Sequence, residues 1–280
     1  MPWWRSVDPA RRRAFLLTGV KILALTVAGL AAGFGLDRLD AHVGGELLGR
    51  VERPELAFVD LPPAVERLGG SDLASVVTDL LDQPWTDPRL CRAMAERLTG
   101  VGWIARVHSV RRTGDGRFEV SARYRIPLAM VQQGGEFLLI DGEGVRLPGT
   151  YFPDPSWKFI RGVRAGAPVA GERWPGDDLS AGLRLVADLS QEPFAAQIAG
   201  VIVENFGGRV AHGRSHIELV SDREGGRIRW GSAPGQEVEE NSVEQKLAIL
   251  RANHRVSGRA DSGHQVIDIS TFPDRFTVPG

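Results

Sequence analysis

The sequence has a single cysteine, Cys91, and only three lysines among its 280 residues. One cysteine excludes an intramolecular disulfide, so packing alone must hold the fold together. The sequence also contains no G-x-S-x-G, H-E-x-x-H, P-loop or dinucleotide-binding glycine pattern. We therefore predict a protein that is not an enzyme and that binds no cofactor or metal.

A large excess of one charge is also missing, because the formal net charge is only -1. Nothing in the overall charge suggests a nucleic-acid partner, and we expect none. Hydrophobic residues make up 42% of the chain, which is enough to bury a core. The length allows one large domain or two small ones.

The chain has one long apolar run, from 14 to 36, and no second one. It follows the basic residues Arg11, Arg12 and Arg13, and Lys21 is its only charge. About 20 apolar residues suffice to span a bilayer, and basic flanks stay in the cytoplasm. We therefore predict a cytoplasmic tail over 1–13, a transmembrane helix over 14–36 and a spacer over 37–53. The remainder would lie outside the cytoplasmic membrane of the cell.

Two alternatives for this apolar run stay open. Lys21 could end the basic part of a cleavable signal peptide, with an apolar stretch over 22–30 and small residues at 31–33. The run could also be the buried helix of a soluble cytoplasmic protein. Such a helix would need a polar face, and this segment has none.

A small α+β domain is predicted over 54–127. Strict alternation of apolar and polar residues over 117–127 is typical of a half-buried strand, and Gly114-Asp115-Gly116 forms the turn before it. Further strands are expected at 55–61 and 103–112. Helices are expected at 71–81, capped by Ser71, and from Asp87-Pro88 to Gly100. The predicted order is strand, helix, helix, strand, strand.

A mixed β domain with two helices is predicted over 128–280. One helix would begin at Ser190, and the other would begin at Ser242 in a capping box with Gln245. The segment 149–180 is rich in proline and glycine and is expected to be an irregular loop. Strands are expected at 137–140, 145–148, 183–188, 209–212, 216–220, 227–231 and 265–269.

Some clusters of titratable side chains could carry chemistry. His212 and His216 are four residues apart, which converges metal ligands only on a helix, whereas a strand–turn–strand is predicted here. The pairs Asp177-Asp178 and Glu239-Glu240 could act as acid and base if burial separated their pKa values. Because both pairs lie in predicted polar loops, we interpret them as helix-start or solvated residues.

The arginines of the first domain form a basic strip along two predicted strands. Arg111 and Arg112 lie on one strand, and Arg117, Arg123 and Arg125 lie on the next. Such a strip is usually the solvated face of a sheet. It could instead be a docking surface for an acidic segment or for anionic headgroups.

The order of these parts resembles the FtsQ/DivIB family of bacterial cell-division proteins, whose first extracytoplasmic domain is a POTRA domain. No single motif is specific, and the weight lies in the co-linear order over most of the chain from residue 14 onward. The matching segments are Pro84-Trp85, 103–107 with 110–112, 118–120, 124–127, 139–145, 228–231, 246–250, 267–269, Phe272-Pro273 and Phe276.

The resemblance implies a membrane scaffold of the division machinery, built from a POTRA-like domain over 54–127 and a β domain over 128–280. Its partners would be other divisome membrane proteins, namely small coiled-coil proteins with one span. They would bind at the C-terminal strand, which we expect to be an edge strand and for which Ile269, Phe272 and Phe276 are the candidate residues, with core packing as the alternative for Phe276. Alternative functions are a POTRA-bearing secretion or envelope adaptor and an envelope enzyme with an unrecognised site.

Overall fold

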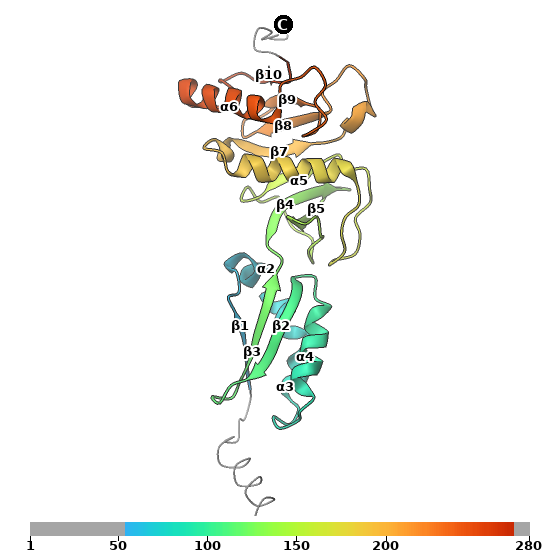
Figure 1. Ribbon diagram of the computed structural model, residues 1–280, viewed down its shortest axis with the longest axis vertical. Coiled ribbons are helices and arrows are strands. Elements are labelled where there is room, and N and C mark those ends of the chain that lie inside the picture. Colours follow the sequence, from blue (N-terminus) through green and yellow to red (C-terminus); the bar gives the residue numbers. More distant parts are fainter. Residues whose placement is uncertain (1–53, 272–280) are drawn as a thin grey trace, which may run out of the picture. The chain divides into compact units, whose positions relative to one another are not determined.

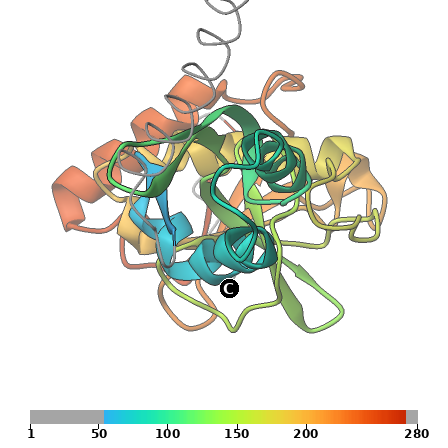
Figure 2. The ribbon, with the colours of Figure 1, turned by 90° about the horizontal axis from the view of Figure 1, so that it is seen from below.

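A computed structural model of the protein describes residues 54–271. The first part of these residues forms a three-stranded sheet in the order β1-β3-β2, and three helices connect β1 to β2 (Figure 1). The helix α4 runs alongside this sheet (Figures 1 and 2). The elements are β1 (Glu55–Val59), α2 (Pro63–Ser75), α3 (Thr78–Leu81), α4 (Leu90–Thr99), β2 (Ile104–Arg112) and β3 (Arg117–Tyr124).

Helix α2 continues through a pair of glycines because a tryptophan ring packs against the first of them. A Cβ atom on Gly69 would lie 2.5 Å from Cε2 of Trp103, a separation that no side chain can adopt. The Trp103 ring is fully buried, and its Nε1 donates to Asp72 Oδ2 at 3.3 Å. The glycine is therefore required for helix–sheet packing.

The structure corrects the predicted helices of this region. The helix expected over 71–81 is two helices, and Ser71 lies inside α2 instead of capping it, because Pro62 occupies the N-cap. The region consequently holds three helices between its strands, not two. The predicted start of α4 is also wrong, because the helix begins at Leu90 with Arg89 at the N-cap, and Asp87 Oδ1 accepts a hydrogen bond from the Arg89 N–H at 2.8 Å in the turn before the helix.

The second part of the chain forms a seven-stranded mixed sheet in the order β10-β9-β8-β7-β6-β4-β5. Of the three pairs of adjacent parallel strands, β6–β7 is joined through helix α5 and β9–β10 through helix α6, as in βαβ units, whereas β4 and β6 are connected through β5. The elements are β4 (Pro127–Gln133), β5 (Glu136–Asp141), β6 (Lys158–Arg161), α5 (Asp177–Ser190), β7 (Ile198–Ile202), β8 (Ile217–Ser221), β9 (Arg227–Gly231), α6 (Val243–Ser257) and β10 (Val266–Asp268).

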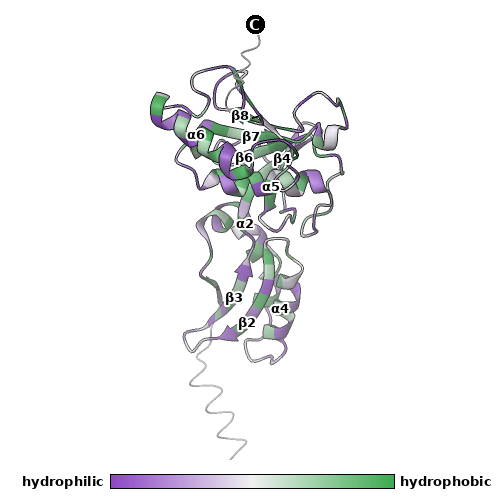
Figure 3. Ribbon diagram, turned by 45° about the horizontal axis from the view of Figure 1, so that its top comes forward, coloured by the Kyte–Doolittle hydropathy of each residue, from purple (hydrophilic) through white to green (hydrophobic). Residues whose placement is uncertain are grey.

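One row of paired residues crosses the whole sheet and forms the part of the hydrophobic core that the strands contribute. Each member is at most 5% exposed, and each comes from a different strand. Both βαβ crossovers run in the same direction along the sheet, so the right-handed rule places α5 and α6 on the same face, above this row. Figure 3 shows the central strands coloured as hydrophobic. The row is Leu138, Val131, Ile160, Val201, Leu219, Ile228 and Ile267.

Several predicted elements of this region are wrong. The strand expected at 183–188 is the middle of α5, and the helix expected from Ser190 is replaced by a short 3₁₀ turn and β7. No strand forms at 209–212, and 145–148 makes only isolated bridges. The strands β4 and β6 were not predicted. The capping box of α6 is confirmed, because Ser242 and Gln245 exchange hydrogen bonds.

The predicted fold class included a transmembrane helix, and this requires a correction. Within 54–271, no helix is both long enough and apolar enough to cross a membrane. Residues 54–271 therefore form an α+β fold with two sheets, and the fold class of these residues includes no membrane-spanning helix. The predicted tail, span and spacer, together with Arg11, Arg12, Arg13 and Lys21, lie outside the described residues.

Candidate functional site

The strand β10 occupies one edge of the seven-stranded sheet, and no strand of 54–271 pairs with its outer side (Figure 1). The opposite edge, β5, is covered by the segment that follows it. The Leu147 N–H donates to Leu139 O at 2.9 Å, and the Tyr151 N–H donates to Phe137 O at 2.8 Å. Among residues 54–271, β10 is thus the one of these two edges that no other segment of backbone covers, and such an edge can pair with another chain.

The backbone of β10 offers a small, defined set of hydrogen-bonding groups. The Ile269 N–H donates to Arg229 O at 3.1 Å, and Gln265 O accepts from the Arg227 N–H at 2.7 Å. In a parallel ladder, alternate residues direct both backbone groups to the same neighbour. Odd-numbered residues of this segment therefore face β9, while the N–H and C=O groups of Val266 and Asp268 face away from the sheet.

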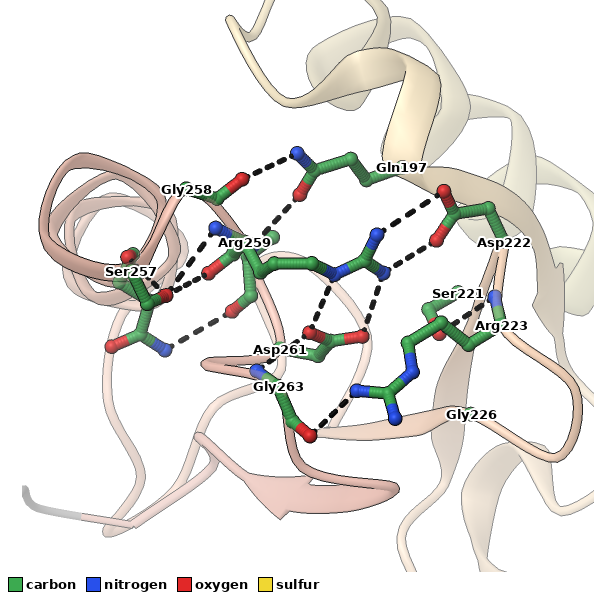
Figure 4. Close-up of polar contacts among 12 residues, drawn as sticks. Gln197, Ser221, Asp222, Arg223, Gly226, Ser257, Gly258, Arg259, Asp261 and Gly263 are labelled. Carbon is green, nitrogen blue, oxygen red and sulfur yellow. Dashed lines mark hydrogen bonds and ion pairs between the residues drawn. The ribbon is translucent and has the colours of Figure 1, made fainter.

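A cluster around Arg259 holds the chain just before β10 (Figure 4). The Arg259 guanidinium lies between two carboxylates. Its Nε and Nη2 donate to Asp261 at 3.0 and 2.9 Å, and its Nη2 and Nη1 donate to Asp222 at 2.5 and 3.3 Å. Since Asp222 follows β8 and Asp261 precedes β10, this Arg259 cluster ties the incoming chain to the sheet.

Two further side chains complete the Arg259 cluster (Figure 4). Gln197 accepts from the Ala260 N–H at 2.8 Å and donates to Gly258 O at 2.9 Å. Arg223 Nη1 donates to Gly263 O at 2.5 Å. The backbone on both sides of Asp261 is therefore fixed by side chains that come from other elements.

The pKa of Asp261 lies below its ordinary value. Burial acts to raise it, since the residue is only 1% exposed, but the hydrogen bonds from Arg259 and from the Gly263 N–H outweigh burial. The carboxylate is consequently held in its ionised form.

We expect this lowered pKa to make part of the folding stability pH-dependent. A carboxylate with a depressed folded-state pKa stabilises fully above its unfolded pKa, about 3.9, and loses that contribution as the pH falls through the folded-state value. Asp261→Asn should therefore destabilise the protein more at pH 5 than at pH 3, as measured by urea unfolding. An equal loss at both values would contradict this assignment.

The chain that leaves β10 is held by Asn241. Its backbone N–H donates to Ser270 O at 2.8 Å, and its Nδ2 donates to Ile269 O at 3.1 Å and to Thr271 O at 2.5 Å. The residue is 1% exposed. One asparagine thus binds three consecutive carbonyl groups.

Asn241 is itself fixed by its neighbours. Glu240 Oε2 accepts from the Ser232 N–H at 2.9 Å and from Lys246 Nζ at 3.0 Å. Lys246 is fully buried, and its ammonium lies 5.3 Å from the centre of the Trp230 ring. The capping box at Ser242 fixes the other side of Asn241.

The residues predicted to bind a partner fall in three places. Ile269 is 1% exposed and belongs to the hydrophobic core, so its side chain cannot reach a partner surface. Phe272 and Phe276 lie outside the described residues. Arg111 is exposed and pairs with Glu119 at 2.6 Å, and the Arg112 guanidinium lies 5.9 Å from the centre of the Phe118 ring.

The remaining arginines of the predicted basic strip also have acidic partners. Arg117 lies 3.0 Å from Glu55, and Arg125 lies 2.8 Å from Asp141, where both side chains are largely buried. Arg123 lies 3.4 Å from Glu143. Since most of its charge is paired, the strip is a weaker attractant for an acidic segment than the sequence indicates.

The acidic pair at the start of α5 has a structural role at Asp178. This carboxylate is 4% exposed and accepts from Arg209 Nη1 at 2.7 Å and from the Arg164 N–H at 2.9 Å. Burial acts to raise its pKa, but these hydrogen bonds outweigh burial and the pKa is lowered. A carboxylate that is ionised, and whose oxygens already accept hydrogen bonds, is suited to a structural ion pair and not to general-acid catalysis.

The histidine and glutamate clusters lie in connections of the second sheet: His212 and His216 lie between β7 and β8, and Glu239-Glu240 lies between β9 and α6. His212 and His216 both lie beside Gly208, but within 54–271 no three histidine, cysteine or acidic side chains converge as metal ligands. Glu240 is engaged by Ser232 and Lys246, as described above. His254 lies 3.2 Å from the Gln197 amide.

Sequence reasoning did not find Arg259, Asp261 or Asn241. Each acts through backbone groups or charges that are distant in the sequence, such as Asp222, which is 37 residues from Arg259. A single sequence carries no signal for such pairs. In comparisons with known proteins, no family model matches the chain, and no curated protein matches it.

Proposed function

We propose that the protein is a non-enzymatic scaffold of the bacterial cell-division machinery, which holds an extended segment of a partner protein along β10. The observation that carries the proposal is an open edge strand that is clamped at both ends, by the Arg259 cluster and by Asn241. Edge strands recruit partners by adding a further strand. The cell-division context and an extracytoplasmic location rest on the resemblance to FtsQ/DivIB proteins.

The partner must contribute more than backbone hydrogen bonds. Each such bond stabilises by about 0.5–1.5 kcal/mol net, and the two outward-facing residues Val266 and Asp268 offer two N–H and two C=O groups. Association costs an estimated 4–15 kcal/mol in lost freedom. Side chains must supply the difference, and the aromatic residues Phe272 and Phe276, which follow β10 in the sequence, are the candidates.

The outward N–H of Asp268 allows the strand-addition proposal to be tested directly. Proline at this position removes that donor and leaves the ladder with β9 in place, because proline is tolerated where its nitrogen faces outward. A photoreactive p-benzoylphenylalanine at Val266 would report the partner in cells. We expect Asp268→Pro to reduce the crosslinked product at least tenfold.

The matched control is Asp268→Ala, which removes the same side-chain contacts with Ser270 and keeps the N–H. It should crosslink nearly as well as the wild type. Equal yields from the proline and alanine variants would exclude pairing through β10. A fluorescent fusion tests the cellular context, since fluorescence spread evenly over the envelope would contradict a role in division.

A further inference from the structure

We infer that Asn241 is the positioning residue of the β10 docking edge, by which we mean the outward-facing backbone groups of Val266 and Asp268. Asn241 sets the path of the chain immediately after β10 and so keeps these groups in a conformation with which a partner strand can pair. This inference rests on the proposed function. It is carried by a separate observation, namely the three consecutive carbonyl groups that one buried asparagine binds.

The ladder with β9 is too short to fix β10 alone. It covers only Val266 to Asp268, and the ends of so short a strand fray readily. Beyond Asp268 the backbone bends away: the Ser270 N–H donates to the Asp268 side chain at 3.0 Å, and the carbonyls of 269–271 turn to Asn241. The asparagine therefore binds every carbonyl group of 269–271, while the Asp268 side chain binds the Ser270 N–H.

Among side chains of this size, that of asparagine carries the two donors that this position needs. Its Nδ2 carries two hydrogens, which satisfy the carbonyls of Ile269 and Thr271 together, while its backbone N–H satisfies Ser270. Aspartate has nearly the same shape but presents a carboxylate oxygen to two carbonyl oxygens. Asn241→Asp thus converts two attractions into two repulsions with almost no change in volume.

The protein offers a closely matched control in Asn205. This residue is also buried, at 6% exposure, and its Nδ2 donates to the carbonyls of Ala211, Arg214 and Ser215 at 3.0, 3.0 and 3.2 Å. It holds the loop between β7 and β8, and two strands separate β7 from β10. Asn205→Asp therefore removes the same kind of contacts at a distance from the docking edge.

The test uses the full-length chain and compares both aspartate variants with the wild type. Amide hydrogen exchange of the purified protein should be at least tenfold faster at Ile269 in Asn241→Asp and within twofold of the wild type in Asn205→Asp. Crosslinking from p-benzoylphenylalanine at Val266 should fall at least tenfold only in Asn241→Asp. The melting temperatures of the two variants should decrease by similar amounts.

The outcomes separate the two proposals. If the wild type gives no product from Val266 that depends on the Asp268 N–H, the proposed function fails. If the wild type crosslinks and Asn241→Asp crosslinks equally well, Asn241 does not position the edge. Equal losses of crosslinking in both variants would show a general effect of stability, which would also overturn the inference. Should Asn241→Asp fail to fold, Asn241→Ala, which removes the donors without adding charge, replaces it with the same expectations.

Discussion

Replacing Arg259 with methionine is expected to lower the free energy of unfolding by about 3 kcal/mol and to abolish partner binding. The substitution leaves the buried Asp261 carboxylate without its cation, and an uncompensated buried charge typically costs about 3–5 kcal/mol. We take the lower end because the Arg259 side chain is 28% exposed, and solvent screens part of the interaction. Urea unfolding measures the loss.

The loss of binding follows from what the Arg259 cluster holds. Without the guanidinium, the chain that leads into β10 is no longer tied to Asp222, so the outward groups of Val266 and Asp268 lose their fixed spacing. The crosslink from Val266 should then disappear under conditions in which most of the protein is still folded. The crosslink measured on folded protein therefore distinguishes a role of Arg259 in positioning β10 from a role in stability alone.

Arg251 provides the control for Arg259. It also pairs with two carboxylates, Glu192 and Glu244, both at 2.8 Å, and Glu192 is similarly buried. It lies on α6, and its hydrogen bonds go to Glu192 and Glu244 and not to the residues that flank β10. Arg251→Met should therefore also lower the free energy of unfolding, because it leaves Glu192 without its cation, and it should leave the crosslink intact. Loss of the crosslink in both variants would refute a specific role for Arg259.

Parts of the fold that depend on local signals could be predicted from the sequence. The alternation in the first half of β3, the capping box of α6 and the terminal strand each arise from neighbouring residues, and all are present in the structure. The predicted strand over 117–127 is too long, because β3 ends at Tyr124 and Ile126 is 56% exposed. The edge position predicted for the terminal strand is also present among the described residues.

Elements governed by tertiary packing could not be predicted. Leu183, Arg184 and Leu185 alternate like a strand, yet α5 forms because Leu179, Leu183 and Val186 share a helical face over the sheet. The strand β4 has no alternation to detect, since both of its faces are largely buried. The contacts of Arg259 and Asn241 join segments far apart in sequence, so the clamps at β10 were missed.

Gly69 and Gly70 are expected to respond to alanine in opposite directions, although they are adjacent in α2. A Cβ on Gly69 would meet Cε2 and Nε1 of Trp103 at 2.5 Å, whereas a Cβ on Gly70 would meet nothing within 4 Å. Trp103 is fully buried and cannot move away without disturbing the core around it. Overpacking of this kind typically costs about 1–3 kcal/mol.

Gly70→Ala should instead stabilise the protein by about 0.5–1 kcal/mol, because glycine in a helix interior is that much less favourable than alanine. The two variants share composition, helix and mutation type, so the difference between their free energies of unfolding isolates the contact with Trp103. Urea unfolding of both variants measures it. If both alanines stabilise the protein, the ring of Trp103 does not pack against Gly69, and helix propensity alone governs this part of α2.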